Sequence, residues 1–353
     1  MNKSKRFLSL IILLVLCIFC TSCSSCGEKV DSADFYYFNT QIHVEVYNSK
    51  LTDKEKEEIS TLLSSLEEEF SVNKESSFVN KFNAQTQGQS QTLSTRDTEI
   101  FNKALECYEF SNGKFNPSVY TLSKLWQFAP SFPVSNFAPP IQADIDQVLN
   151  NGSLDILNGI TLSGNLLTKN NQDIKLDFGG IVKGYAVDKI AKILTDGGHT
   201  EGYVNAGGSS MKILSCESLG VTHPRSQGEI LTIIDLPKNV SVSTSGDYQK
   251  YYTFNGQRYS HIIDCQTGYP PNTGIISATI ICPDGTFADA ISTALCLYEY
   301  DQAISLMNKI LEKYPSSQIY LIYQNDNQKS IITNKTKGEH FTLLDNSYSV
   351  VKI

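Results

Sequence analysis

Strand-like runs come in groups in this chain, and this order constrains the fold more than any other feature. Regular alternation of strands with helices would indicate a doubly wound parallel sheet, and that alternation is absent. We therefore expect an α+β fold with mixed or antiparallel sheets and packed helices. The runs, rich in β-branched and aromatic residues, fall at 35–47, 160–168, 173–178, 201–205, 211–215, 230–235, 275–282, 317–323 and 328–333.

Helical segments separate some of these groups. Thr52 is a plausible N-cap, and Ile59, Leu63 and Leu66 give the residues after it one apolar face. A second helix is expected after Ser94. Residues 129–141 contain four prolines, which predicts a loop that crosses the surface or covers a site. Further helices are expected at 143–150, 181–196, 287–297 and 299–313.

The N-terminus has the three parts of an export signal: basic residues, an apolar run and small residues before Cys23. The run is shorter than the roughly 20 residues that a membrane span needs. We expect a lipoprotein signal peptide over 1–22, with Cys23 as the lipid attachment site. A plain secretory signal cut nearby is the alternative. Residues 23–34 would be a tether, and 35–353 one domain or two intimately packed subdomains, held in the bacterial cell envelope and facing the periplasm or the exterior.

Charge and cysteine usage exclude several classes of protein. The formal net charge is −8, and removal of 1–22 takes away only basic residues. Such a domain repels nucleic acid and anionic lipid headgroups, so we expect no nucleic-acid partner and membrane attachment through the lipid. An odd number of domain cysteines without CxxC spacing argues against a zinc site and a full disulfide framework. These cysteines are Cys107, Cys216, Cys265, Cys282 and Cys296.

One segment that is suited to ligand binding runs from 176 to 185. It places Asp177 at a predicted strand end, then two glycines, then a helix start with Lys183 in its first turn. Glycines let the backbone approach a ligand, and helix N-termini with a lysine suit phosphates. The segment lacks the GxGxxG pattern of a Rossmann site, and a simple tight turn is the alternative.

A second segment, 287–295, puts Asp289 and Thr293 four residues apart on a predicted helix, so they share one face. A carboxylate and a hydroxyl, completed by a backbone carbonyl and ligand phosphates, suit Mg²⁺. The alternative is that Asp289 caps its own helix and Thr293 bonds back to the preceding turn.

The third segment, 243–270, is dense in polar groups between apolar runs and contains His261. A histidine beside a turn, with a carboxylate three residues later, could act as a general base near neutral pH. A structural hydrogen-bonding role is the alternative.

Taken in order, these segments resemble the ApbE-type FAD:protein FMN transferase family over nearly the whole mature chain. Three further blocks contribute to the resemblance. Residues 70–83 resemble the early S…S…N block, 113–119 with Leu125 and Trp126 resemble the GxFDPTV…LW block, and 205–208 resemble the central Gly-Gly turn.

The resemblance implies a T-fold-like core and Mg²⁺-dependent transfer of FMN from FAD to a Ser or Thr hydroxyl of an exported or membrane flavoprotein subunit, releasing AMP. His261 would be the base that activates this hydroxyl. The metal residues would be Asp289, Thr293 and the carbonyl of Gly180, with Ser292 where some members place a further carboxylate. The FAD contacts would be Phe38, Asn73, Lys114, Phe115, Asn116, Asp177, Lys183 and Ile263.

Some positions depart from the family's pattern. Asn116 stands where Asp is frequent, Ser209 follows the central glycines where Asp is usual, and Asn73 replaces a frequent aromatic.

Two alternative functions use the same residues. One is an Mg²⁺-dependent FAD pyrophosphatase that yields FMN and AMP, and the other is a non-catalytic flavin-binding lipoprotein.

Overall fold

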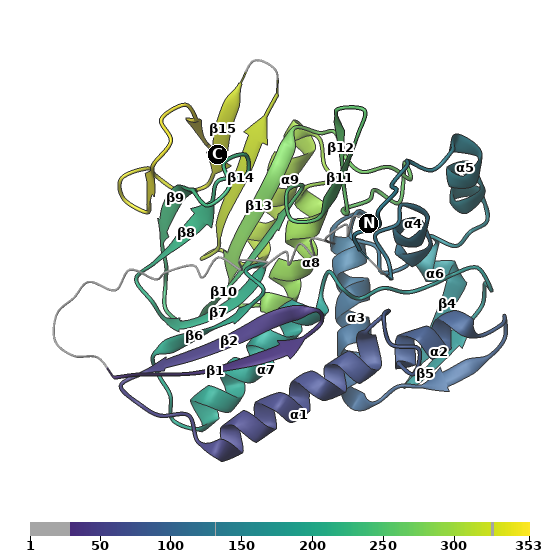
Figure 1. Ribbon diagram of the computed structural model, residues 1–353, viewed down its shortest axis with the longest axis horizontal. Helices are drawn as coiled ribbons and strands as arrows, with labels where there is room; N and C mark the ends of the chain where they lie inside the picture. Colours follow the sequence, from purple (N-terminus) through teal and green to yellow (C-terminus); the bar gives the residue numbers. More distant parts are fainter. Residues whose placement is uncertain (1–28, 131, 326–327) are drawn as a thin grey trace, which may run out of the picture.

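A large mixed sheet organises the chain in the computed structural model, which describes residues 29–130, 132–325 and 328–353 (Figure 1). Within these residues the sheet has nine strands in the order β1-β2-β6-β7-β10-β13-β14-β15-β17. Neighbours run antiparallel except β15 and β17, which are parallel. The strands are β1 (Val30–Tyr37), β2 (Thr40–Tyr47), β6 (Gly202–Ala206), β7 (Ser210–Ser215), β10 (Val240–Gly246), β13 (Ile275–Cys282), β14 (Gln318–Gln324), β15 (Lys329–Thr333) and β17 (Ser349–Lys352).

Three smaller sheets and a set of helices surround the large sheet. The small sheets pair β16 (Phe341–Leu343) with β9 (Ile230–Asp235) and β8 (Ser218–Thr222), β3 (Ser90–Thr92) with β5 (Leu166–Lys169) and β4 (Ile160–Ser163), and β11 (Tyr251–Phe254) with β12 (Gln257–Ser260). The helices are α1 (Asp53–Phe70), α2 (Phe78–Ala84), α3 (Thr95–Phe110), α4 (Tyr120–Leu125), α5 (Gln142–Asn150), α6 (Ile156–Gly159), α7 (Val182–Asp196), α8 (Gly285–Leu295) and α9 (Tyr300–Lys313).

The two faces of the large sheet are covered differently. Helices α1, α7, α8 and α9 pack on one face and enclose the main apolar core, while β8, β9 and β16 cover the other face over a second core. A third, smaller core lies among α4, α5 and the segment that follows β12. Figure 1 shows α4 and α5 standing to one side of the sheet. The predicted α+β class is confirmed.

Two predicted single strands are hairpins. The run at 35–47 divides at Phe38 and Asn39, both with φ of 55°, as a two-residue turn with left-handed residues requires. The run at 160–168 turns at Gly164, with φ of 63°. Strand β1 begins at Val30, so the end of the predicted tether belongs to the sheet.

The strand predicted at 173–178 does not form. Its alternating apolar residues, Ile174, Leu176 and Phe178, are buried, but no neighbouring strand pairs with them in the part of the chain that the structure describes. The side chain of Asn83 takes the place of a neighbour. Its amide donates to the Leu176 carbonyl at 2.9 Å, and its oxygen accepts from the Leu176 N–H at 2.7 Å. The alternation of apolar residues therefore predicted correctly which side chains are buried, although the segment forms no strand.

The predicted export signal and Cys23 lie outside the described residues. Within the described part of the chain, no helix combines the length and apolar character that crossing a membrane requires.

Helices α7 and α8 cross at Gly184, where the backbones come unusually close. A Cβ at Gly184 would lie 2.1 Å from the carbonyl oxygen of Gly285 and 2.8 Å from Cβ of Asp289. Only glycine fits this position, since both contacts are shorter than real Cβ atoms make. The crossing fixes how far α8 stands from the N-terminus of α7.

A buried polar chain ties the start of α1 to the end of α7. Oγ of Ser49 lies 2.7 Å from Nδ1 of His199, whose Nε2 lies 3.0 Å from Oε1 of Glu55. The other Glu55 oxygen accepts from the backbone N–H and the hydroxyl of Thr52, completing a capping box. Burial raises the pKa of Glu55, but these hydrogen bonds and the charge of His199 outweigh it, and the pKa lies below its ordinary value.

Substitution Gly184→Ala is expected to destabilise the protein by at least about 2 kcal/mol, because the new methyl group overpacks the crossing. Urea unfolding followed by circular dichroism measures the change. Lys192→Ala, on the exposed side of the same helix, is the control and is expected to shift stability by no more than about 0.5 kcal/mol. Equal stability of Gly184→Ala and the wild type would contradict this description of the crossing.

Substitution Glu55→Gln is expected to cost on the order of 1 kcal/mol near pH 7. A lowered folded-state pKa means that the carboxylate stabilises the fold above about pH 4.3 and that this stability is lost as the pH falls through the folded value. The difference in the free energy of unfolding between the wild type and Glu55→Gln should therefore become smaller as the pH falls. Unfolding at several pH values tests this, with the exposed Glu58→Gln as the control; a difference that grows in acid would refute it.

Candidate functional site

Asp289 caps the N-terminus of α7, not its own helix. Its Oδ2 accepts from the backbone N–H of Gly184 at 2.9 Å, and the residue is only 4% exposed. Helix α8 begins at Gly285 and is capped by Asp284, whose Oδ1 accepts from the N–H of Phe287 at 2.9 Å. A carboxylate at a helix N-terminus is stabilised by the helix dipole. The second oxygen, Oδ1, can still accept from a ligand, because a carboxylate accepts at both oxygens.

Thr293 lies one turn along α8 from Asp289 and belongs to a small hydroxyl cluster. Its Oγ1 lies 3.0 Å from Oγ of Ser245 on β10 and 3.4 Å from the carbonyl of Asp289. Ser245 also lies 2.9 Å from Oγ of Ser292, which is fully buried and donates to the Asp289 carbonyl at 3.0 Å. Ser292 therefore lies on the buried side of the cluster, whereas Thr293 is partly exposed.

Gly180 and Phe115 border this cluster. A Cβ at Gly180 would lie 3.8 Å from Oγ1 of Thr293 and 3.4 Å from the Phe115 ring. The structure thus brings together Gly180, Asp289 and Thr293 from two segments more than 100 residues apart. Among the described residues, no group of three or more His, Cys, Asp and Glu side chains is arranged to hold a metal. A cation here would need backbone, hydroxyl and ligand oxygens, which is how proteins hold Mg²⁺.

The loop before α7 carries Asp177 and Lys183. Oδ1 of Asp177 accepts from the N–H of Gly179 at 2.8 Å, and Nζ of Lys183 donates to the Gly179 carbonyl at 3.0 Å. Burial raises the pKa of Asp177, against the effects of the Gly179 hydrogen bond and of the positive charges on Lys250 and Lys183. The N-cap residue of α7, Ile181, makes no side-chain cap of its own, and the side-chain acceptor in the first turn is Asp289, which accepts from the N–H of Gly184. The loop therefore offers a helix N-terminus and a lysine to an anion.

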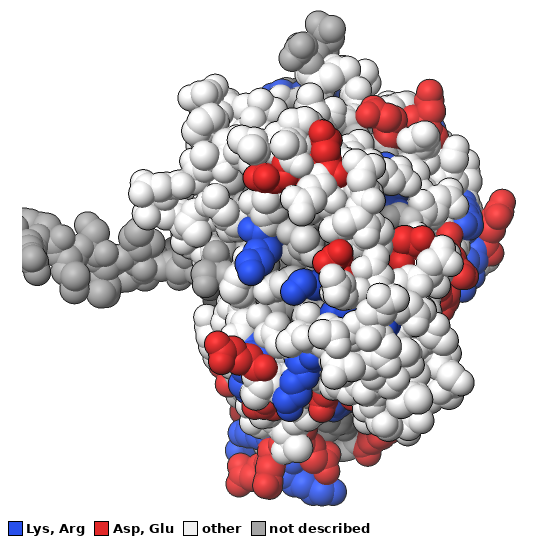
Figure 2. Space-filling model, turned by 90° about the vertical axis from the view of Figure 1, so that its right-hand side faces the viewer, with Lys and Arg blue, Asp and Glu red and all other residues white. Residues whose placement is uncertain are grey.

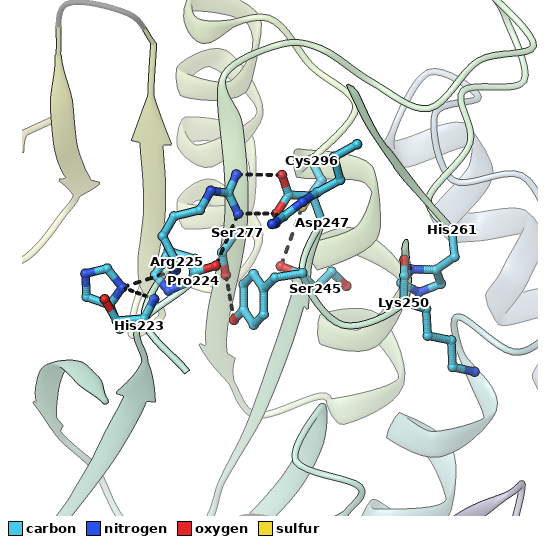
Figure 3. Close-up of polar contacts among 12 residues, drawn as sticks. His223, Pro224, Arg225, Ser245, Asp247, Lys250, His261, Ser277 and Cys296 are labelled. Carbon is cyan, nitrogen blue, oxygen red and sulfur yellow. Dashed lines mark hydrogen bonds and ion pairs between the residues drawn. The ribbon is translucent and has the colours of Figure 1, made fainter. Parts of the chain in front are cut away.

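His261 follows β12 and is held in one tautomer (Figure 3). Its Nδ1 lies 3.1 Å from the Lys250 carbonyl, which can only accept, so Nδ1 carries the proton and Nε2 keeps its lone pair. Burial, assisted by the charges of Lys250 and Lys183, lowers the pKa of His261 from 6.5 to about 4. The imidazole is therefore neutral near pH 7 and able to accept a proton at Nε2.

The proline-rich loop packs beside His261. The ring of Phe128 lies 6.3 Å from the His261 ring, and Phe137 stacks on Tyr252 of β11 at 4.1 Å. The Tyr252 hydroxyl accepts from the N–H of Val134 at 2.9 Å and donates to the Gln127 carbonyl at 3.0 Å. The loop and the β11–β12 hairpin therefore form one aromatic unit that flanks the histidine.

Three predicted flavin contacts are engaged within the protein. Nζ of Lys114 donates to Oδ2 of Asp264 at 2.7 Å. The Asn116 amide donates to the Leu154 carbonyl at 2.9 Å, and its oxygen accepts from the backbone and hydroxyl of Ser118. The side chain of Ile263 is buried in the small core with α4 and α5. The flavin contacts of these three residues stay predictions.

Phe38 and Asn73 lie near the C-terminal end of α1. The N–H of Phe38 donates to Oε1 of Glu67 at 2.7 Å, and the N–H of Asn73 bonds to Oγ of Ser71, the residue that ends the helix. Asn73 is exposed. Phe38 also packs against the main apolar core.

Several contacts of the site, made by residues of the polar segment 243–270, were not predicted from the sequence. Ser245 and Lys250 hold Thr293 and His261, and Asp247 between them pairs with Arg225 of the β8–β9 loop through two 2.7 Å bonds (Figure 3). Alternation of Ser and Val over 240–245 signals a half-buried strand, and Asn255-Gly256 signals a hairpin. The contacts themselves join distant segments and leave no local signal.

Charges on the molecular surface are mixed. On the face shown in Figure 2, basic side chains are interspersed with acidic ones and with large uncharged areas, and no broad basic patch forms there.

Comparison with known proteins identifies the family of this chain. Residues 38–315 match the model of the ApbE family. A FAD:protein FMN transferase of Vibrio cholerae is 29% identical over 72% of this chain and 76% of its own, and one of Haemophilus influenzae is 27% identical over 85% and 88%. The ApbE structure from Thermotoga maritima superposes with a TM-score of 0.73 and 26% identity over 84% of this chain and 94% of its own. The flavin transferase ApbE structure from Vibrio cholerae gives a TM-score of 0.74 at 22% identity, over 86% and 97%. The chain belongs to the ApbE family.

Proposed function

We propose that this chain is an FAD:protein FMN transferase, which transfers FMN from FAD to a Ser or Thr hydroxyl of an acceptor flavoprotein and releases AMP. The relatives named above carry this activity in their names and match most of the chain. The observation that supports it most is the tautomer of His261, because a neutral imidazole with a free Nε2 is what activation of a hydroxyl requires.

The proposed reaction is a phosphoryl transfer with one proton movement. The acceptor oxygen forms a bond to the phosphorus of the FMN half, and the bond from that phosphorus to the bridging oxygen breaks. The bridging oxygen leaves with AMP and both bonding electrons, while the hydroxyl proton passes to Nε2 of His261. Such transfers depend mainly on positioning and on neutralising phosphate charge. Lys183 and the N-terminus of α7 supply positive potential.

We propose Mg²⁺ as the metal of this reaction. Asp289 Oδ1, Thr293 Oγ1 and the Gly180 carbonyl would hold it, a set of hard oxygen donors that suits this ion. When bound, the ion would neutralise charge on the phosphate oxygens. Ser292 is buried and bonded to Ser245, so we assign it to support of the site, not to the metal.

We also propose that the protein is anchored to a membrane of the bacterial envelope through lipid on Cys23. The seven-residue step from Cys23 to Val30, the start of β1, spans at most roughly 25 Å. This short reach would hold the domain, and its acceptor, near the membrane surface.

Substitution Asp289→Asn is expected to lower kcat for flavin transfer about 100-fold or more, because it removes the charge that faces the cation. The amide oxygen can still accept from Gly184, so the fold is retained. Acceptor-linked flavin fluorescence after denaturing electrophoresis, with FAD and Mg²⁺, measures transfer. Asp196→Asn, an exposed change on α7, is the control.

Release of FMN and AMP by the wild type without flavin on any acceptor would overturn the proposal in favour of a pyrophosphatase. Tight FAD binding without turnover would instead favour the flavin-binding lipoprotein.

The lowered pKa of His261 predicts its behaviour in acid. Protonation removes the lone pair of Nε2, so in the ligand-free protein the base should stay competent until the pH approaches about 4. Nuclear magnetic resonance of labelled histidine should show the Nδ1–H tautomer at pH 7 and a midpoint near pH 4. A midpoint near 6.5 would contradict the surroundings described for His261, and an Nε2–H tautomer at neutral pH would contradict the proposed base.

A further inference from the structure

The β11–β12 hairpin, which leads into His261, is joined to the large sheet by a short connection. Strand β10 ends just before Asp247, whose N–H still donates to the Ile276 carbonyl of β13 at 3.0 Å. Strand β11 begins at Tyr251, so only residues 248–250 separate the sheet from the hairpin. Among the described residues, β11 and β12 pair only with each other. Because no ladder joins the hairpin to the sheet, side-chain contacts must fix its position.

Two arginines from different elements meet at the Asp247 carboxylate. Nη1 and Nη2 of Arg225, on the β8–β9 loop, donate to Oδ1 and Oδ2 at 2.7 Å each (Figure 3). Nη1 of Arg258, on β12, forms an ion pair with the same Oδ1 at 3.5 Å. A guanidinium that bonds to both carboxylate oxygens fixes the orientation of the carboxylate as well as its distance. The side chains of Asp247, Arg225 and Arg258 are 24%, 29% and 33% exposed, so solvent screens the cluster only in part.

Arg258 extends this cluster to the hairpin. It lies on β12, three residues before His261. Its guanidinium carbon lies 4.2 Å from the centre of the Tyr251 ring, a cation–π contact with the first residue of β11. Arg258 therefore contacts Asp247 at one end of the connection and Tyr251 at the other.

The loop that carries Arg225 is itself fixed. Nδ1 of His223 accepts from the backbone N–H groups of Arg225 at 3.1 Å and of Ser226 at 2.9 Å, so the proton of this imidazole is on Nε2. Nε2 donates to Oδ2 of Asp345, in the segment between β16 and β17, at 3.2 Å. Arg225 therefore connects the small sheet of β8, β9 and β16 with the β11–β12 hairpin through Asp247.

We propose that Asp247 is a positioning residue for the base His261. Held by Arg225 and Arg258, its carboxylate fixes the β11–β12 hairpin at the end of β10. The Lys250 carbonyl, just before β11, then stays in place to accept from Nδ1–H and to keep His261 in one tautomer. The inference rests on the proposed function and deepens it, because it assigns to Asp247 the orientation of the proposed base.

The tautomer of His261 shows why this orientation matters. If the hairpin shifts and the bond from Nδ1–H to the Lys250 carbonyl is lost, the ring can carry its proton on Nε2 instead. An imidazole with the proton on Nε2 cannot accept another proton there. A positioned base contributes roughly 10²–10⁴-fold to a rate, and part of this factor would depend on Asp247.

Substitution Asp247→Asn removes the charge and places a donating amide beside the guanidinium of Arg225. We expect kcat for flavin transfer to fall about 10-fold or more, as a part of the contribution of the base. KM for FAD and for the acceptor should not change, because Asp247 bonds to arginines and not to a residue proposed to hold FAD. Arg225→Lys keeps the charge and loses the paired bonds, so its kcat should be intermediate. Asp301→Asn, an exposed change at the start of α9, is the matched control and should keep the kcat of the wild type.

A double variant tests whether Arg225 acts through Asp247. Effects of residues in one ion-pair network do not add, so Arg225→Met combined with Asp247→Asn should lower kcat no further than Asp247→Asn alone. If the two single fold-changes multiply in the double variant, the residues act separately, which would contradict the proposed cluster.

Nuclear magnetic resonance of labelled histidine gives a readout that is independent of turnover. At pH 7, His261 should carry its proton on Nδ1 in the wild type and populate both tautomers in Asp247→Asn. A variant that unfolds at lower urea concentration but keeps the kcat and the tautomer of the wild type would show that the cluster only stabilises the fold. A raised KM with unchanged kcat would show a role in binding. Either result overturns the inference and leaves the proposed transferase intact. Absence of flavin transfer by the wild type, with the expected change of tautomer in Asp247→Asn, would overturn only the proposed function.

Discussion

The close crossing of α7 and α8 at Gly184 is the constraint on which the rest of the site depends. Because no side chain separates the helices, the Asp289 carboxylate reaches the N-terminus of α7 and bonds to the Gly184 N–H. The same carboxylate therefore stabilises a helix end, and its residue lies one helical turn before Thr293. The bond to the Gly184 N–H explains how the Asp289 carboxylate is accommodated in a buried position, and the proposed metal site would use the same group.

Rigid elements position the remaining groups. Ser245 on β10 fixes Thr293, the ladder of β11 and β12 fixes His261, and the first turn of α7 carries Lys183. Each side chain comes from the end of an element, where backbone groups are open to a ligand. Since phosphoryl transfer gains most from placement and charge neutralisation, such a site needs no nucleophile from the enzyme.

Sequence reasoning was most reliable where the signal is local. The caps at Thr52 and Ser94 located α1 and α3, and the four-residue spacing of Asp289 and Thr293 predicted their shared face. It failed where partners are distant. The helix that Asp289 caps lies about 100 residues away, and the strand expected at 173–178 is replaced by pairing with Asn83.

Burial explains two other features. The side chains of Asn116 and Ile263 make internal hydrogen bonds and packing contacts, and their flavin contacts stay predictions. Strand β10 was not predicted despite its alternating pattern, because Ser241, Ser243 and Ser245 occupy buried positions where apolar residues would ordinarily mark a core strand. These buried serines are satisfied by hydrogen bonds that only the tertiary structure supplies.

A crystal of the protein soaked with FAD and Mn²⁺, measured for anomalous scattering, tests the central claim most directly. The account predicts one metal peak within coordination distance of the Asp289 carboxylate, Thr293 Oγ1 and the Gly180 carbonyl, with the pyrophosphate beside Lys183 and the FMN phosphorus facing His261. Bound FAD whose pyrophosphate lies away from these residues, or a metal peak that does not touch Asp289, would contradict it.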